Sequence, residues 1–230
     1  MFDQNIGVVR PAKDLIPGAM TDLFFCHSWG AFHTDGGSVV LALPDAPIVQ
    51  IGGIRTCAWD EQLPFCAGKA HLYSHVYHNL LNTDCPVWQD VLSEFRYSVW
   101  FVDGEKIGVG KADRVARSMG GALGAQLGSL STDGVDVRHH VDIPSDAVRL
   151  LSLRKLCDGR LRVRLENLSD EPVETTIHLG LSLQEAWMED LLGERLGILP
   201  VVCDDSICLL LSPNQLMSLV VVPISASVPG

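Results

Sequence analysis

The sequence predicts an all-β, antiparallel fold crossed by one α-helix. Short apolar or alternating segments, separated by turn residues, fill the chain after residue 134 at spacings of about 8–12 residues, which is typical of a β-sandwich. Only residues 106–127 carry apolar side chains at the three- and four-residue steps of a helix. We therefore expect a layered β structure with a single helix across it.

The N-terminal part of the chain is expected to begin irregularly. Residues 1–30 are mixed in composition and contain Pro11 and Pro17, so they read as a lead-in with little regular structure. Residues 38–43 and 47–54 are short apolar runs on either side of a proline-containing connection. Such runs next to turn residues predict two strands.

The clearest strand of the N-terminal half covers residues 94–101. Phe95, Tyr97, Val99 and Phe101 alternate there with polar residues, which is the period-two signature of a half-buried strand. Trp100 falls between them and is expected on the polar face of that strand.

The predicted helix at residues 106–127 depends on packing. Val115, Met119 and Leu123 lie on its apolar side, and we expect them to be buried against a sheet. Three glycines near its end each lower the intrinsic helix stability by about 1 kcal/mol relative to alanine. They would also permit a close approach between the helix and a sheet.

The C-terminal half predicts a series of strands. Residues 148–156 and 160–166 flank Asp158-Gly159, a strong hairpin-turn signal. Further strands are expected at residues 173–179, 183–191, 197–202, 206–211 and 215–222. We expect one β-sandwich domain over residues 31–222, followed by a tail at 223–230.

Composition limits the class of protein. A formal charge of −11 argues against nucleic-acid binding, which needs clustered Lys and Arg. No apolar run approaches the roughly 20 residues of a membrane helix. The seven cysteines form no C-x-x-C pair, and several sit in apolar runs, so we expect reduced thiols. With no apolar core for a signal peptide at the N-terminus, we expect a cytoplasmic protein without membrane or nucleic-acid partners.

Three collinear segments carry a resemblance to a known family. They are SVVLALPDAPIVQIGGI at residues 38–54, HLYSHVYHNLLNTDCPVWQDVLSEFRYSV at 71–99, and RLRVRLENLSDEPVETTIHLGLSLQEAWMEDLLGERLG at 160–197. Together with the closing apolar run at 207–222, they resemble the C-terminal half of glycoside hydrolase family 38, the α-mannosidases. The resemblance extends over roughly residues 28–222.

The resemblance implies a galactose mutarotase-like β-supersandwich with one crossing helix. It also implies that the nucleophile and the zinc ligands belong to a separate N-terminal domain. No segment of this chain matches the H-x-D-x-x-W motif of that domain. We therefore expect no catalytic residue, metal ligand or cofactor in this chain, and zinc only on a catalytic partner domain.

One loop corresponds to the sugar-facing segment of the family. The resemblance implies substrate-binding roles for His78, Asn79, Asn82, Thr83 and Asp84. Where the family has two aromatic residues, a histidine and a tyrosine, this chain has Leu80, Leu81, Asn82 and Cys85. Their loss weakens the expected contact with a sugar.

Other candidate residues favour structural roles. His33-Thr34-Asp35 reads as a turn before a strand, and His71, His75 and His78 are expected to be scattered by an extended backbone rather than gathered on zinc. Tryptophans are more often core residues than sugar-stacking platforms. The four considered as a platform are Trp59, Trp88, Trp100 and Trp187.

The leading functional hypothesis is a non-catalytic C-terminal β-sandwich portion of a family 38-like α-mannosidase. It would support or border a sugar-hydrolysing site supplied by another polypeptide, and would be inactive in hydrolysis alone. The alternatives are an independent carbohydrate-binding module and a structural subunit without sugar contact. The partners that this hypothesis leaves open are a catalytic hydrolase polypeptide, a glycan and an oligomeric partner.

Overall fold

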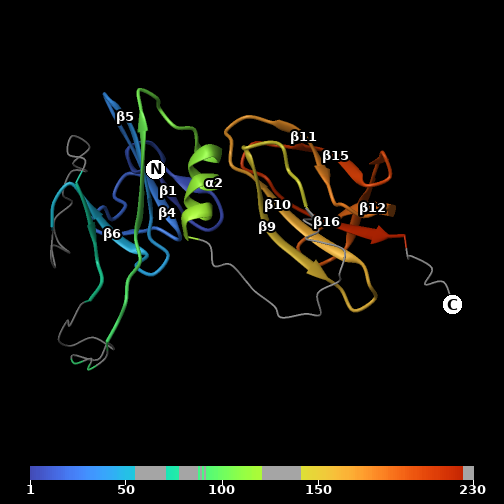
Figure 1. Cartoon of the computed structure of the whole chain (residues 1–230), viewed down its shortest axis with the longest axis horizontal. Coiled ribbons are helices and arrows are strands. Elements are labelled where there is room, and N and C mark those ends of the chain that lie inside the picture. The colour runs from blue at the N-terminus through green and yellow to red at the C-terminus, as the bar shows by residue number, and fades with distance from the viewer. Residues whose placement is uncertain (55–70, 78–87, 89, 91, 121–140, 225–230) are drawn as a thin grey trace, which may run out of the picture. The chain divides into compact units, whose positions relative to one another are not determined.

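The computed structural model describes residues 1–54, 71–77, 88, 90, 92–120 and 141–224 (Figure 1). The chain divides into two compact units, Met1–Ala122 and Leu123–Gly230. Both are built from antiparallel sheets, so the expected all-β class is confirmed. The predicted domain bounds at residues 31–222 stay a prediction.

The described residues of unit 1 form two sheets. The larger has the order β2-β1-β4-β5-β8, and the smaller has the order β3-β6-β7. The strands are β1 (Phe2–Asp3), β2 (Val8–Val9), β3 (Phe24–Phe25), β4 (Trp29–Thr34), β5 (Gly37–Ala42), β6 (Ile48–Ile51), β7 (Leu72–Ser74) and β8 (Ser98–Asp103). Two helices, α1 (Pro11–Asp14) and α2 (Val109–Gly120), complete its described part.

The lead-in is more ordered than its composition indicates. It contains β1, β2, α1 and β3, and Phe2 is fully buried in an apolar cluster with Phe24, Cys26 and Val49. Phe2 stacks on Phe24, with ring centroids 6.0 Å apart. Aromatic burial of this kind fixes the short strands, which propensity alone would not hold.

Helix α2 lies along one face of the larger sheet (Figure 1). Ala112 and Ala116 are buried in the cluster formed with that sheet, so small side chains make the closest contact. Val115 and Met119, expected to be buried, are half-buried, and Met119 packs against the same cluster. Leu123 lies outside the described residues, and the helix begins at Val109 rather than at residue 106.

The face of β8 differs from the prediction. Trp100 and Val102 pack into the cluster under α2, whereas Val99 and Phe101 are 50% and 74% exposed. The strand carries large apolar side chains on both faces, so alternation alone does not decide which face is covered. The position of α2 decides it, and the interpretation of Trp100 as a polar-face residue was wrong.

Unit 2, over its described residues 141–224, also forms two sheets, with the orders β13-β12-β16-β10-β9 and β11-β15-β14. Its strands are β9 (Val148–Lys155), β10 (Leu161–Asn167), β11 (Val173–His178), β12 (Leu183–Glu189), β13 (Arg195–Leu199), β14 (Val201–Val202), β15 (Ser206–Leu211) and β16 (Leu216–Pro223). Most follow the predicted segments within two residues. The hairpin turn between β9 and β10 is confirmed, with Gly159 at φ +88°.

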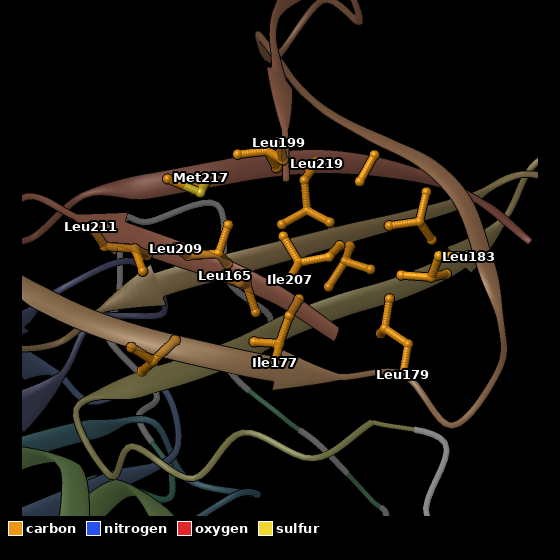
Figure 2. Packing of buried hydrophobic residues seen from close by; sticks show 14 residues of the cluster. Leu165, Ile177, Leu179, Leu183, Leu199, Ile207, Leu209, Leu211, Met217 and Leu219 are labelled. Atoms are coloured by element: carbon orange, nitrogen blue, oxygen red, sulfur yellow. The ribbon is translucent and has the colours of Figure 1, made fainter. Parts of the chain in front are cut away.

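The core of unit 2 lies between its two sheets. Figure 2 shows Leu165, Ile177, Ile207 and Leu219 converging from four different strands, and all four are fully buried. The inward faces predicted from alternation in β10 and β11 are therefore confirmed. The two sheets of unit 2 are therefore held together by one continuous apolar cluster.

Candidate functional site

The residues expected to face a sugar lie in one unplaced segment of the chain. His78, Asn79, Asn82, Thr83 and Asp84 all fall within residues 78–87, which lie outside the described residues. Their roles therefore stay a prediction. The structure does describe the two arms that lead into and out of this segment, residues 71–77 and 92–97, which we call the loop stem.

Two contacts join the arms of the loop stem. The Ser74 hydroxyl lies 2.9 Å from the Tyr97 hydroxyl. The rings of Tyr77 and Phe95 meet edge to face, with centroids 5.6 Å apart and planes at 86°. A hydrogen bond and an aromatic pair of this geometry each contribute about 1 kcal/mol. The stem is thus closed by one polar and one aromatic contact between segments some twenty residues apart.

An ion pair fixes the second arm of the stem. The Arg96 guanidinium donates to both carboxylate oxygens of Asp45, at 2.8 Å from Nε and 2.9 Å from Nη2. The Arg96 backbone N–H adds a third bond of 2.9 Å to the same side chain. These hydrogen bonds lower the pKa of Asp45 to about 2. The arm is therefore tied to the connection between β5 and β6.

Sequence reasoning did not find the Asp45–Arg96 pair. The two residues are 51 positions apart, and each sits among ordinary turn or strand residues. No local pattern indicates that they meet. Only the fold, which brings the β5–β6 connection beside the start of β8, supplies that information.

Aromatic side chains around the stem are open to solvent. Trp88 is 79% exposed, and Tyr77 and Tyr97 are also exposed. Exposed rings are the usual surface on which a sugar ring stacks. Trp100 does not join them, because it packs under α2.

The remaining tryptophans of the predicted platform are placed elsewhere or not placed. Trp187 is buried in unit 2, with the guanidinium carbons of Arg160 and Arg195 at 5.4 and 4.6 Å from its ring centroid. Those cations occupy the ring surface that a sugar would use. Trp59 lies outside the described residues.

The histidines do not gather in the part of the chain that is described. His71 meets Tyr73 edge to face, His33 lies in β4 with its ring nitrogen 3.0 Å from the Ser38 hydroxyl, and His78 lies outside the described residues. The turn predicted at residues 33–35 lies slightly later: His33 and Thr34 belong to β4, and the turn to β5 is formed by Asp35 and Gly36. Over the described ranges, no group of three or more His, Cys, Asp or Glu side chains is arranged to hold a metal ion.

A serine–histidine contact in unit 2 has a structural arrangement. His178 Nδ1 lies 2.7 Å from Ser206 Oγ, and that hydroxyl donates to Asp205 at 2.5 Å. Ser206 is buried and its proton is already directed to a carboxylate. A nucleophilic serine needs an accessible oxygen whose proton the histidine accepts. This cluster holds β11 against β15 instead.

The described cysteines are free thiols. Among the placed cysteines Cys26, Cys157, Cys203 and Cys208, none is in a disulfide; Cys26 is buried, whereas Cys157 and Cys203 are exposed. Burial, followed by the nearby charge of Asp3, raises the pKa of the Cys26 thiol to about 12.

No described helix has the length and apolar character needed to cross a membrane.

Comparison with known proteins gives a similarity in structure but none in sequence. The chain matches no protein-family model and no curated protein sequence. Its structure is similar to that of an α-mannosidase from Enterococcus faecalis V583, with a TM-score of 0.52 and 14% sequence identity. The match covers 95% of this chain but only 24% of that one. At this identity the similarity shows the fold: this chain has the β architecture of about a quarter of an α-mannosidase.

Proposed function

We propose that this chain is the non-catalytic C-terminal β-sandwich portion of a family 38-like α-mannosidase, bordering a sugar-hydrolysing site that another polypeptide supplies. The observation that carries the proposal is the structural similarity of nearly the whole chain to one quarter of an α-mannosidase. The collinear sequence segments at residues 38–54, 71–99 and 160–197 point to the same enzymes.

The loop stem gives this proposal a place on the molecule. Its two arms are joined to each other through Ser74 and Tyr97 and to the sheet connection through Asp45 and Arg96. A loop on such a support can hold polar side chains at a fixed position against a partner domain or a glycan. The chemistry of hydrolysis, including zinc, belongs to the partner in this proposal.

The experiment is co-purification of the tagged chain from its native host, followed by assay of aryl α-mannoside hydrolysis with and without added zinc. We expect a larger polypeptide with a zinc-dependent hydrolase domain in the active fraction, and no turnover by the purified chain alone. Turnover that stays with the repurified chain and disappears when one of its own carboxylates is replaced would overturn the proposal.

Matched variants test the role of the stem. Asp45→Ala removes the anchor of the stem, whereas Asp158→Ala removes a similarly exposed Asp–Arg contact at the β9–β10 turn of unit 2. We expect the first variant to reduce activity of the complex and the second to leave it unchanged. Equal effects of the two variants would show that the loop stem has no specific role in the activity of the complex.

A specific observation favours one alternative function, an independent carbohydrate-binding module. The exposed rings of Trp88, Tyr77 and Tyr97 are close in sequence to the predicted sugar-facing loop. If this alternative holds, the chain alone binds mannosides in calorimetric titration, and Trp88→Ala abolishes the heat of binding. The leading proposal expects no measurable binding without the partner.

A further inference from the structure

The outer face of the sheet β13-β12-β16-β10-β9 of unit 2 carries a group of arginines (Figure 1). On β10, Arg162 and Arg164 alternate with residues of the buried core, so both lie on the face away from that core. Arg154 of β9 stands opposite Arg162 and therefore shares this face. Like charges on neighbouring strands destabilise a sheet, so each cation needs a compensating group.

Only part of this charge is compensated by carboxylates. Arg162 holds Glu189 through Nε and also through Nη2, which donates at 3.0 Å. Glu166, the next acidic residue along β10, accepts from Arg149. Within the described part of the chain, no acidic side chain forms an ion pair with Arg154 or Arg164. Two positive charges are therefore left over on this face.

Arg164 also has a buried hydrogen-bond donor that lacks an acceptor. Its Nε is fully buried, and no atom of the described residues accepts from it. Buried polar atoms in this condition are rare, and an ion bound at the site is one of their few explanations. The side chain as a whole is half-buried. Partial removal from water strengthens the attraction of such a guanidinium for an anion.

A hydroxyl group lies beside the two unpaired arginines. Ser152 of β9 stands directly opposite Arg164, and Arg154 is two residues further along β9 on the same face. Opposite and diagonal neighbours on a sheet are about 5–8 Å apart, which is within the reach of long side chains. Ser152 and Arg154 are both exposed. The three side chains therefore surround one spot on the sheet, which we call the arginine-pair site.

We propose that the arginine-pair site binds a dianionic phosphate group, either as free phosphate or as a monoester. Guanidinium groups match the oxygens of phosphate in geometry, and a serine hydroxyl can donate to a further oxygen. A phosphate monoester carries about −1.5 to −2 charges at pH 7, which balances Arg154 and Arg164 together. A carboxylate would balance only one of them.

The charge of the whole chain favours a small ligand over a polyanion. Binding to nucleic acid requires the neutralisation of several phosphates at once. The arginine-pair site offers two uncompensated cations on a chain whose formal charge is −11. It therefore suits a single phosphate group. The inference does not depend on the proposed function.

Titration of the ¹⁵N-labelled full chain, followed by NMR at pH 7 and constant ionic strength, tests the inference. The probes are inorganic phosphate, methyl phosphate and acetate. We expect saturable shifts of the Arg164 Nε–H signal and of the amides of residues 152–154 and 163–165, with a phosphate dissociation constant of about 0.1–1 mM. Acetate should bind about tenfold more weakly or worse.

The two phosphate probes distinguish the sources of the ligand. Tighter binding of methyl phosphate than of inorganic phosphate would assign the site to an ester, and the reverse order would assign it to free phosphate. Acetate that binds as tightly as both phosphates would refute a phosphate site. Shifts that stay linear in phosphate up to about 20 mM would also overturn the proposal, because they would show an adventitious ion only.

Three variants that each remove one positive charge make the test specific to the site. Arg154→Gln and Arg164→Gln should each raise the phosphate dissociation constant about tenfold or more, with the backbone amides as the readout. Lys155→Gln is the matched control, because Lys155 is adjacent on β9 but alternates to the other face. It should leave the constant within about twofold of the wild type.

The variants also keep the proposal open to refutation if one of them fails to fold. Arg154 is exposed, so Arg154→Gln tests the site even where the half-buried Arg164 cannot be replaced without loss of structure. Unchanged phosphate binding in Arg154→Gln would overturn the proposal. An equal loss in Lys155→Gln would do the same, because it would show a general effect of charge.

Discussion

Replacing Arg149 by methionine removes one half of an ion pair that lies inside unit 2. Arg149 on β9 and Glu166 on β10 stand opposite each other, with side chains 1% and 2% exposed. The guanidinium donates to Glu166 Oε2 from Nε at 3.0 Å and from Nη2 at 2.5 Å. Because the carboxylate is out of water, losing its cation leaves a buried charge without that compensation.

The magnitude follows from the depth of burial. Breaking a buried pair by removing one partner costs about 3–5 kcal/mol, whereas an apolar pair of similar volume is often neutral or better. We therefore expect about 3–5 kcal/mol of destabilisation for Arg149→Met. The double variant Arg149→Met with Glu166→Leu should return to within about 1 kcal/mol of the wild type.

Hydrogen exchange of the β10 and β16 amides is the appropriate assay, because the chain has two units and a single unfolding transition cannot be assumed. A loss of 3–5 kcal/mol accelerates the slowest amides by roughly two to three and a half orders of magnitude. Arg160→Met, in an exposed pair with Asp158, is the control and should change these rates little. Acceleration below about tenfold for Arg149→Met, or a double variant as unstable as the single one, would refute the reasoning.

Three further outcomes are expected. Met119→Ala should cost about 1–2 kcal/mol, measured by hydrogen exchange of the β4 and β5 amides of unit 1, less than a fully buried methionine, because the side chain is only half-buried; a cost of about 4 kcal/mol or more would contradict its placement. Iodoacetamide at neutral pH should label Cys157 well before Cys26, whose thiol is buried with a pKa raised to about 12, and equal labelling rates would show that Cys26 is accessible. The contact with Arg96 lowers the pKa of Asp45 from 3.8 to about 2, so it contributes stability above about pH 4 that is lost as the pH falls through 2. Hydrogen exchange of the Arg96 amide should therefore accelerate in that pH range, and Asp45→Asn should remove the pH dependence.

The strands of unit 2 were largely predictable from the sequence, and the reason is local. Each combines period-two alternation with nearby turn residues, as in the hairpin around Gly159, so that pattern and turn chemistry agree. The ion pairs on the same sheet were not predictable in this way. Arg162 alternates with apolar residues as a solvent-facing cation would, yet it pairs with Glu189, a residue 27 positions later that is nearly buried.

The candidate site was predictable only by resemblance. Nothing in the spacing of Asn79, Asn82 and Asp84 indicates a sugar site, and the family pattern alone assigns them that role. The support beneath the loop depends on pairs distant in sequence, such as Asp45 with Arg96, which no local signal reveals. Long-range pairs of this kind form only when the fold brings two surfaces together.

The two faces of β8 explain the error in the sequence prediction. Alternation correctly identified two distinct faces, but the strand is apolar on both, with Trp100 and Val102 on one and Val99 and Phe101 on the other. Helix α2 covers only the first face. A strand with one polar face would need no second cover, whereas this one leaves Phe101 74% exposed. Alternation therefore predicts that β8 has two faces, but only the position of α2 decides which of them is covered.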